Sequence, residues 1–129
     1  MPIQIDIQQG IYDVLSAGLS YPVFDDVPQD FEGFPYVTIG DTTFGEFSSD
    51  IKSGFDITAT IHVWSRYAGS KEAKEIQGEI YTLLHRQNLP LTGDYGISGI
   101  TFDFSQVMLD PDGLTRHGVI RFDMHASEV

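Results

Sequence analysis

The stretch Phe55-Asp56-Ile57-Thr58-Ala59-Thr60-Ile61-His62-Val63-Trp64 decides the fold class of this chain. Apolar side chains stand at every second position from Phe55 to Val63, and mostly polar ones stand between them. Because successive side chains of a β-strand point to opposite faces of a sheet, this pattern predicts a strand with one buried and one wetter face. Such a strand is typical of an antiparallel sheet that is covered on one side.

A helical pattern lies on each side of that strand. From about Asp6 to Leu19, and again from about Lys71 to Arg86, apolar residues recur at steps of three and four. This spacing predicts two helices, each with one apolar face. We expect Ser70 to be the N-cap of the second helix. We also expect Gly78, in the middle of that helix, to mark a close approach to another element.

Three further strands complete the expected sheet. Residues 34–40 form one of them, with Pro35 at its start, and residues 96–109 and 114–126 form a β-hairpin. The hairpin turn is Asp110-Pro111-Asp112-Gly113, in which Asp opens the turn, Pro presets φ and Gly accepts a positive φ. In the first hairpin strand one face is expected to carry Ile100, Phe102, Phe104 and Met108.

The resulting element order is α-β-β-α-β-β. It predicts an α+β fold in which two helices pack on one face of a four-stranded, mainly antiparallel sheet, a two-layer sandwich. We expect a single domain over residues 1–129, since chains of this length commonly form one domain. The expected flexible part is residues 41–54, either a long loop or extended strand arms. Its aromatic and aliphatic residues either fold back onto the core or dock on a neighbouring subunit; they are Phe44, Phe47 and Ile51.

The charge of the chain is strongly acidic and uneven. The sequence has 19 Asp and Glu against 7 Lys and Arg, a formal net charge of −12, and nine of the acids precede the first basic residue, Lys52. This balance disfavours a nucleic-acid-binding surface, because phosphate binding depends mainly on Lys and Arg. Two interpretations remain: a self-repelling soluble surface, or one acidic face on a subunit that is repeated in an assembly.

The sequence carries no recognisable catalytic or metal-binding motif. It contains no cysteine, and it has no GxSxG, GxxxxGK[ST], GxGxxG or HExxH pattern. Its four histidines lack the paired spacing of a metal site, and we expect no metal, cofactor or catalytic residue; they are His62, His85, His117 and His125. The N-terminus lacks the features of a secretory signal, and the chain contains no apolar run of ~20 residues, so a cytoplasmic protein is expected.

Two clusters of polar and aromatic residues have simple structural interpretations. Trp64, Arg66 and Tyr67 stand where the central strand ends, and we expect them to pack at the corner between strand and helix. A cation–π contact or a stacked surface group is the alternative. The basic residues of the hairpin, Arg116, His117 and Arg121, are expected to pair across the strands with Asp103 and Asp123 rather than to bind phosphate.

Three blocks of sequence together resemble a known family. They are FPYVTIG at residues 34–40, HVWSRYAGSKEA at residues 62–73 and DPDGLTRHG at residues 110–118. In this spacing they resemble the tail completion family of long-tailed bacteriophages and prophages, which is related in architecture to the lambda-type tail terminator and to gene-transfer-agent tail terminators. The resemblance runs from about Ile7 to Met124. It covers these motif residues: Pro35, Tyr36, Trp64, Arg66, Asp110, Asp112, Gly113, Arg116 and His117.

The resemblance implies a non-enzymatic virion protein of the tail, assembled in the cytoplasm of the bacterial host. It implies a homo-oligomeric ring, a hexamer that matches the six-fold tail tube, with DNA passing through the lumen without specific binding and with no membrane contact. Such a ring caps the tail tube and presents a surface to a head-completion or connector protein. The residues themselves leave a second function open, a monomeric α+β adaptor or small-ligand-binding domain.

Overall fold

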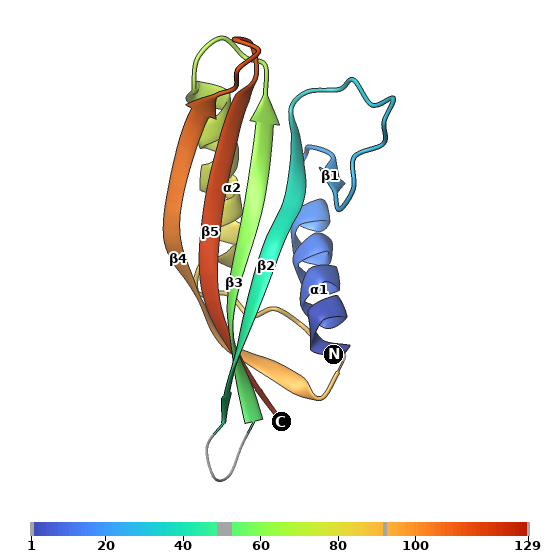
Figure 1. Ribbon diagram of the computed structural model, residues 1–129, viewed down its shortest axis with the longest axis vertical. Coiled ribbons are helices and arrows are strands. Elements are labelled where there is room, and N and C mark those ends of the chain that lie inside the picture. The colour runs from blue at the N-terminus through green and yellow to red at the C-terminus, as the bar shows by residue number, and fades with distance from the viewer. Residues whose placement is uncertain (1, 49–52, 92, 129) are drawn as a thin grey trace.

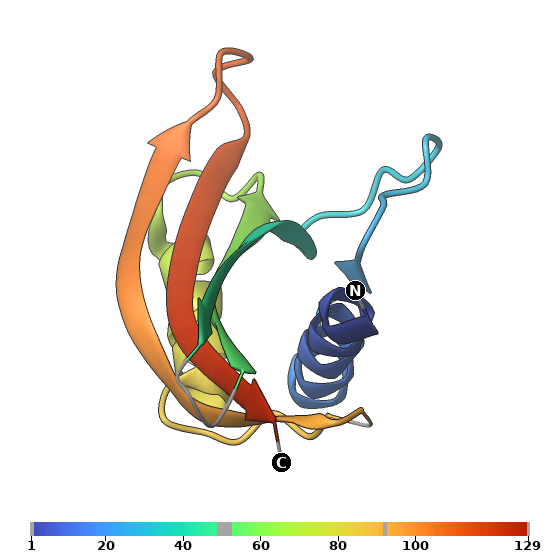
Figure 2. The same ribbon diagram turned by 60° about the horizontal axis from the view of Figure 1, so that its bottom comes forward.

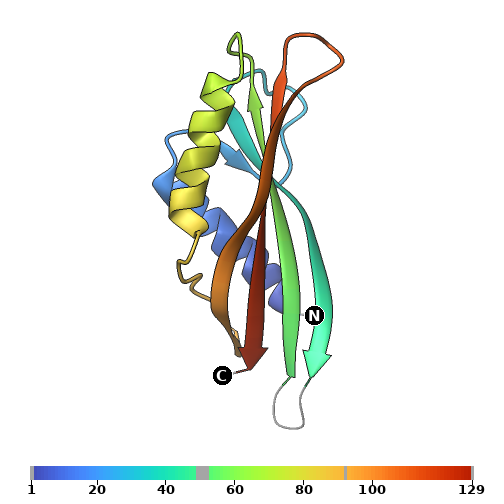
Figure 3. The same cartoon turned by 90° about the vertical axis from the view of Figure 1, so that its left-hand side faces the viewer.

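A computed structural model describes residues 2–48, 53–91 and 93–128 of the chain (Figure 1). The elements are α1 (Pro2–Gly18), β1 (Val23–Phe24), β2 (Tyr36–Ser48), β3 (Ser53–Ser65), α2 (Lys71–Leu84), β4 (Tyr95–Leu109) and β5 (Arg116–Glu128). The five strands form one sheet in the order β1-β2-β3-β5-β4. Both helices cover the same face of this sheet, and its other face is open (Figure 3). The fold is therefore α+β, with two helices on one sheet.

The alternation of the central strand is confirmed. Ile57, Ala59, Ile61 and Val63 of β3 are buried toward the helices. The opposite residues of the neighbouring strand are buried on the same face; they are Ile120, Phe122, Met124 and Ala126 of β5. The helices complete one core cluster with their apolar stripes, Ile3, Ile7, Ile11 and Leu15 from α1 and Ala73, Ile76, Ile80 and Leu84 from α2. Removal of this apolar surface from water drives the packing of the two layers.

The sheet has five strands rather than the expected four. The additional strand, β1, consists of Val23 and Phe24 and pairs in parallel with Val37 and Thr38 of β2. The N–H of Val37 also donates to the carbonyl of Pro22 at 2.9 Å. The sheet is therefore mixed, although the four long strands pair antiparallel as predicted. A two-residue strand is too short to show any hydrophobic periodicity, so the sequence pattern did not predict it.

The start of α1 and the capping of α2 differ from the expectation, whereas α2 begins at Lys71 as predicted. Helix α1 begins at Pro2, ahead of Asp6, and proline is tolerated in a first helical turn because its missing N–H has no partner there. Ser70 makes no side-chain cap of α2. Ser65, which is fully buried, donates instead from its hydroxyl to Glu72 at 2.7 Å and accepts the N–H of Tyr67 at 3.1 Å. These bonds fix the corner between β3 and α2.

Close approaches occur at glycines of α1, whereas the expected one at Gly78 is absent. A Cβ at Gly78 would meet no atom within 4 Å. A Cβ at Gly10 would lie 3.0 Å from the Leu89 side chain, and one at Gly18 would lie 2.5 Å from that of Leu83. The segment that follows α2 and the end of α2 itself therefore pack directly on the backbone of α1.

A β-bulge places two apolar side chains of β4 on the open face, against the expectation. The register of β4 on β5 shifts between Phe102 and Phe104, so that Phe102 lies opposite the buried Phe122 and Phe104 lies opposite Arg121. An extra residue in one strand reverses the face of every side chain beyond it. Phe104 and Met108 therefore face away from α2, which Phe102 contacts through the ring of Tyr81.

Most of residues 41–54 is strand. β2 continues to Ser48 and β3 begins at Ser53, so the described part forms the two arms of a long hairpin. The hairpin extends at the end of the sheet opposite to the turn between β4 and β5 (Figures 1 and 2). The sequence had allowed either a long loop or extended strand arms for residues 41–54, and the described part forms strand arms. No helix in the described ranges is long and apolar enough to cross a membrane.

Candidate functional site

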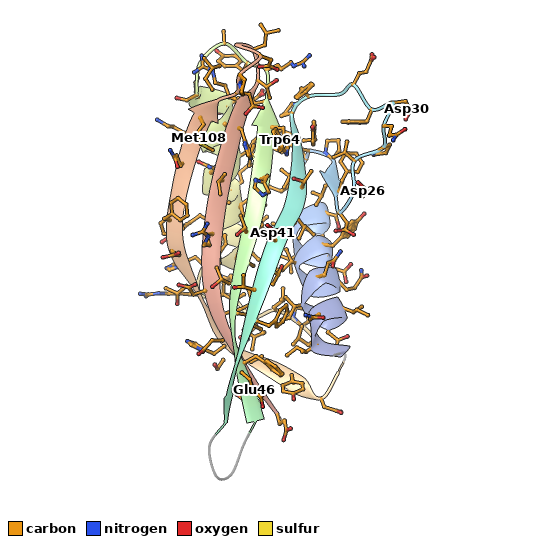
Figure 4. The ribbon with its side chains drawn as sticks, viewed as in Figure 1. Asp26, Asp30, Asp41, Glu46, Trp64 and Met108 are labelled. Atoms are coloured by element: carbon orange, nitrogen blue, oxygen red, sulfur yellow. The ribbon has the colours of Figure 1, made fainter. Side chains whose placement is uncertain are left out.

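The three sequence blocks that carry the family resemblance meet at one end of the sheet. Tyr36 of β2 lies opposite Trp64 of β3, and Trp64 lies opposite His117 of β5. Figure 4 shows Trp64 near the end of β3. We call the region formed by residues 34–38, 62–67 and 110–117 the motif end of the sheet. Antiparallel pairing brings these distant segments together because the register places their residues in one row across the strands.

Aromatic rings stack along that row. The rings of Trp64 and His117 are nearly parallel, with centroids 3.9 Å apart and an angle of 8°. The Tyr36 ring lies on the other side of Trp64, with centroids 6.2 Å apart. The indole Nε1 of Trp64 donates to the Thr38 hydroxyl at 3.1 Å. Trp64 thus faces the open side of the sheet, so the expected packing at the corner between strand and helix is wrong for it, and the alternative, a stacked surface group, is what the structure shows.

Arg66 connects the three blocks. Its guanidinium lies over the Phe34 ring, 4.5 Å from the centroid, next to the cis peptide bond between Phe34 and Pro35. Its Nε donates to the Thr115 hydroxyl at 3.2 Å, and its Nη2 lies 3.9 Å from the Asp112 carboxylate. A planar guanidinium can make a stacking contact and hydrogen bonds at the same time, which a lysine ammonium cannot do. Arg66 therefore holds the start of β2 against the turn between β4 and β5.

The turn from Asp110 to Thr115 is built around the carboxylate of Asp112. Its Oδ1 accepts the N–H groups of Leu114 and Thr115, each at 2.8 Å, and its Oδ2 accepts the Thr115 hydroxyl at 2.6 Å. These bonds, the one from the Thr115 hydroxyl above all, lower the pKa of Asp112 to about 2. Gly113 has a φ of 72°, a conformation that glycine adopts without strain. The geometry agrees with the turn-forming role that the sequence indicated for these residues.

A pair of histidines lies beside the aromatic row. The Nδ1 of His62 and the Nε2 of His117 are 2.7 Å apart, a distance at which one ring N–H donates to the other ring. Burial lowers the pKa of both imidazoles, and His117 lowers that of His62 further, while the carboxylates of Asp41 and Asp110 oppose these shifts. The sequence did not predict this pair, because only the register of β3 on β5 brings the two rings together. In the described ranges no three His, Cys, Asp or Glu residues could jointly hold a metal ion.

The expected ion pairs of the hairpin are replaced by other contacts. The guanidinium of Arg121 lies over the Phe104 ring, 4.6 Å from its centroid. The carboxylate of Asp123 accepts the hydroxyl of Thr58 at 3.1 Å. His117 approaches Asp110, with 3.9 Å between its Nδ1 and the carboxylate, instead of Asp103 or Asp123. The bulge that turns Phe104 to the open face accounts for the contact of Arg121.

Exposed apolar side chains gather at the motif end. The exposed fractions are 51% for Tyr67, 37% for Met108, 51% for Leu109 and 64% for Leu114. Leu109 and Leu114 flank the turn between β4 and β5, and Arg66, the neighbour of Tyr67, is hydrogen-bonded to Thr115 of the same turn. A rigid turn that presents apolar side chains to solvent is typical of a protein-binding surface.

The open face also carries a groove of about 560 Å³. Its lining residues are Asp41, Thr43, Thr58, Thr60, His62, Val119 and Arg121. A second groove, of about 620 Å³, lies where the end of α1 meets α2; it is lined by Gly18, Tyr21, Glu75, Gly78, Glu79, Thr82 and Leu83. Both are open to solvent and lined by polar groups together with a few apolar ones.

The acids of the first part of the chain do not share one face. Asp6 and Asp13 lie on α1, four acids lie between β1 and β2, and Asp41 and Glu46 lie on β2. Figure 4 shows Asp26 and Asp30 at one side of the molecule, Asp41 on the sheet and Glu46 toward the hairpin end. Asp50 lies outside the described residues. A single acidic face made from all nine acids is therefore not present in the described part of the chain.

Of the three expected interface residues, Phe44, Phe47 and Ile51, the structure describes the side chain of Phe44 alone. Phe44 is half-buried and its ring lies edge-to-face with that of Phe55, with centroids 6.3 Å apart. Phe47 belongs to β2 opposite Gly54, and its side chain lies outside the described residues, as does all of Ile51. Phe44 thus folds back onto the core, which was one of the two interpretations. A contact of this segment with a neighbouring subunit remains a prediction.

Comparisons with known proteins agree with the resemblance. Residues 13–126 match the model of the family described as tail completion protein gp17. A relative named tail completion protein gp17, from Bacillus phage SPP1, is 32% identical over 88 residues. The match covers 68% of this chain and 64% of that relative. A solved chain from the virion of a native gene transfer agent particle has the same fold, with a TM-score of 0.86 and 20% identity over 95% of each chain.

These findings define a class of protein, the structural components of phage-type tails. The chain belongs to the tail completion protein gp17 family, because the family model matches most of its length. Its place is accordingly the virion tail. The sequence blocks that suggested the family are the same residues that the sheet gathers at the motif end.

Proposed function

We propose that this chain is a ring subunit that caps the end of a tail tube and joins it to a head-completion or connector protein. The family match over residues 13–126 carries the proposal. The motif end supports it, because it combines a turn fixed by hydrogen bonds with exposed apolar side chains and so suits a binding surface rather than a reaction centre. We propose six copies of this chain per ring, so that the ring matches a tail tube of six-fold symmetry.

A ring of identical subunits requires a heterologous interface, in which one patch meets a different patch of the next copy. The hairpin formed by β2 and β3 supplies one side of this interface in our proposal, with Phe47, Ile51 and the exposed part of the half-buried Phe44 as its apolar residues. It suits the role because it extends beyond the two helices at the end opposite to the turn between β4 and β5 (Figure 1).

Light scattering and negative-stain microscopy of the purified protein test the ring. We expect a mass about six times that of the 14.4 kDa chain, alone or after addition of tail tubes. Deletion of residues 45–53 should leave a folded monomer that forms no ring. A deletion variant that still assembles would contradict the role of the hairpin, and a full-length chain that is monomeric in both conditions would favour the adaptor function.

We further propose that DNA passes through the ring without binding to it. The net charge of −12 supports this, since a negative surface repels phosphate. A mobility-shift assay with duplex DNA at low salt, where non-specific binding is strongest, should show no retention. Retention that disappears at higher salt would reveal a basic lining and contradict the proposal.

A further inference from the structure

The outer edge of β4 is covered in one part and open in another. β4 is the last strand of the sheet, and among the described residues only β5 pairs with it (Figure 1). Far from the motif end, the segment after α2 covers this edge. The N–H of Arg86 donates to the carbonyl of Ile100 at 2.8 Å, and the N–H of Phe102 donates to the Nδ1 of His85 at 3.1 Å. The open part is therefore the stretch next to the motif end.

The hydrogen bonds of the ladder show which backbone groups of this stretch face outward. In an antiparallel pair, every second residue directs its N–H and C=O toward the partner strand, and the residues between direct theirs away. The N–H of Asp110 donates to the carbonyl of Thr115 at 2.8 Å, so Asp110 faces β5. Since the register has no shift beyond Phe104, the outward groups, to which no described residue is hydrogen-bonded, belong to Ser105, Val107 and Leu109.

The same stretch lacks the features that usually protect a free edge. From Phe104 to Leu109 the sequence is FSQVML, which contains no charged residue and no proline, and no bulge interrupts it. Charged side chains, prolines and bulges are the usual means of preventing edge pairing. This part of β4 is therefore able to bind an additional strand.

A further groove, of about 340 Å³, runs between this edge and α2. Tyr81, Phe102 and Val107 contribute apolar surface to it, and Gly78 leaves it open, since a Cβ there would meet no atom within 4 Å. Every second side chain of an added strand would point toward this groove. Lys74 also lines it, is exposed, and forms no ion pair with a described residue. The groove therefore suits a large apolar side chain with a carboxylate nearby.

A second copy of this chain is poorly placed to supply the strand. Gln106 and Val107 lie in the same rows of the sheet as Thr38 and Val37 of β2. At this height β1 already pairs with β2, so a neighbour in a ring about an axis along the strands would offer only the two residues of β1. Pairing of β4 with another β4 requires a two-fold axis, which closes a dimer instead of a ring.

We propose that the Ser105–Leu109 edge of β4 binds an extended segment of a different virion protein as an additional strand. The segment has alternating apolar residues, with a large one toward α2 and a carboxylate that reaches Lys74. Main-chain hydrogen bonds supply affinity in this mode of recognition, and the groove for alternate side chains supplies selectivity. The inference rests on the proposed function, in that the segment belongs to the tail tube or connector protein, and it leaves the hairpin of β2 and β3 as the contact between subunits.

Hydrogen exchange of the full chain, with and without tail tubes or connectors, tests the added strand. The outward amides of Ser105, Val107 and Leu109 should exchange rapidly in the chain alone, whereas those of Gln106 and Met108, which bond to β5, should exchange slowly. A bound partner should slow the three outward amides by about tenfold or more. Binding that leaves them fast would overturn the inference and leave the ring subunit standing. Absence of binding to either partner would contradict the proposed function as well.

A proline variant tests the outward N–H of Ser105. Proline is compatible with an edge strand where its missing N–H faces outward, so Ser105→Pro removes a donor without breaking the ladder. We expect it to weaken co-sedimentation with the partner by about tenfold or more. Ser105→Ala keeps the N–H and should bind like the wild type, and both variants should keep the mass of the ring.

The other results with this pair of variants also have defined meanings. Equal binding of folded Ser105→Pro and Ser105→Ala would overturn the inference. Loss of the ring by folded Ser105→Pro alone would show that this edge joins copies of the chain, which would overturn it too. If Ser105→Pro does not fold, the exchange of the outward amides decides.

Charge reversal tests the carboxylate of the partner segment. Lys74→Glu should weaken co-sedimentation by about fivefold or more, because it places two acids against each other. Lys71→Glu makes the same change on the same helix, where the ammonium lies 3.8 Å from the Glu75 carboxylate, and should have little effect. Equal binding of the two folded variants would overturn the assignment of an acidic segment to this groove.

Discussion

At the scale of single residues, Asp112 is the group whose ionisation matters most for the motif end. Hydrogen bonds from Thr115 and Leu114 lower its pKa to about 2, against an ordinary value of 3.8. A carboxyl group whose pKa is lower in the folded state stabilises the fold above its unfolded pKa. This contribution is therefore complete above about pH 4 and is lost as the pH falls through about 2.

The variant Asp112→Asn tests this contribution. It keeps one acceptor oxygen and loses the charge, so its melting temperature at neutral pH should lie below that of the wild type. The difference should shrink as the pH falls from about 4 toward 2, because the wild-type carboxylate then becomes protonated. Thermal unfolding followed by circular dichroism measures it, with Asp30→Asn in the loop between β1 and β2 as the control. A difference that is independent of pH would contradict the role of the charge.

The histidine pair predicts a pH dependence at higher pH. Because the pKa values of His62 and His117 are lowered from 6.5 in the folded protein, the unfolded chain binds more protons at mildly acidic pH. Stability should therefore fall as the pH drops below about 6.5, and these groups should have no effect well above it. His62→Gln should show a smaller loss than the wild type when urea midpoints are compared. Ring proton signals of His62 that titrate above pH 6.5 would contradict the prediction.

At the scale of elements, two glycines of contrasting surroundings form a matched pair. Gly78 lies exposed in α2 and a Cβ there would meet nothing, so Gly78→Ala should stabilise the protein by about 0.5–1 kcal/mol. A Cβ at Gly118 would lie 2.8 Å from the Gln77 side chain and 3.3 Å from that of Val63, so Gly118→Ala should cost about 1–3 kcal/mol. Urea unfolding measures both. Equal effects of the two substitutions would contradict the packing described.

The cost at Gly118 arises from the way in which α2 is fixed to the sheet. The buried Gln77 amide donates to the carbonyls of Gln106 and Val119, at 3.1 and 3.2 Å, and so connects the helix to both strands of the hairpin. A side chain at position 118 would push this amide away and leave buried polar groups without partners, which is expensive. Gly118, the last residue of the block DPDGLTRHG, is thus required because the Gln77 side chain of α2 packs against its backbone.

The elements that the sequence predicts well are those whose apolar residues recur with one period. The alternation in β3 and the stripes of α1 and α2 each arise from burial of one face, so the pattern and the structure have the same cause. The elements that it misses depend on partners elsewhere in the chain. β1 exists because Pro22 and Val23 meet β2, and the face of Phe104 depends on where β4 bulges against β5.

The candidate site was predicted as a set of residues without their contacts. The family blocks identified Trp64, Arg66, Asp112 and His117, and the turn chemistry around Asp112 follows from local sequence alone. The stacking of Trp64 on His117 and the contact of His62 with His117 require the register of β3 on β5, which no local pattern specifies. Sequence reasoning therefore located the motif end but placed Trp64 on the wrong side of the sheet.

At the scale of the whole molecule, the two ends of the sheet differ in what they offer a partner. The hairpin of β2 and β3 extends at one end, and the motif end, with its exposed apolar side chains, occupies the other (Figure 1). If the hairpin of β2 and β3 joins the subunits into a ring, as we propose, the motif end remains free to bind a protein other than this chain. Its exposed residues should then affect binding to the tail tube or connector while the ring itself stays intact.

The substitution Leu114→Ser tests this division of roles. Leu114 is 64% exposed next to the turn, and Ile5, on α1, is 72% exposed and provides the control Ile5→Ser. Neither side chain contributes to the core, so both variants should fold with the stability of the wild type to within about 0.5 kcal/mol. We expect Leu114→Ser to reduce co-sedimentation with tail tubes or connectors and to leave the mass of the ring unchanged, because an exposed apolar side chain at a binding surface is desolvated only in the complex. Loss of binding by Ile5→Ser instead would place the partner on α1, and loss of the ring by Leu114→Ser would make the motif end part of the contact between subunits.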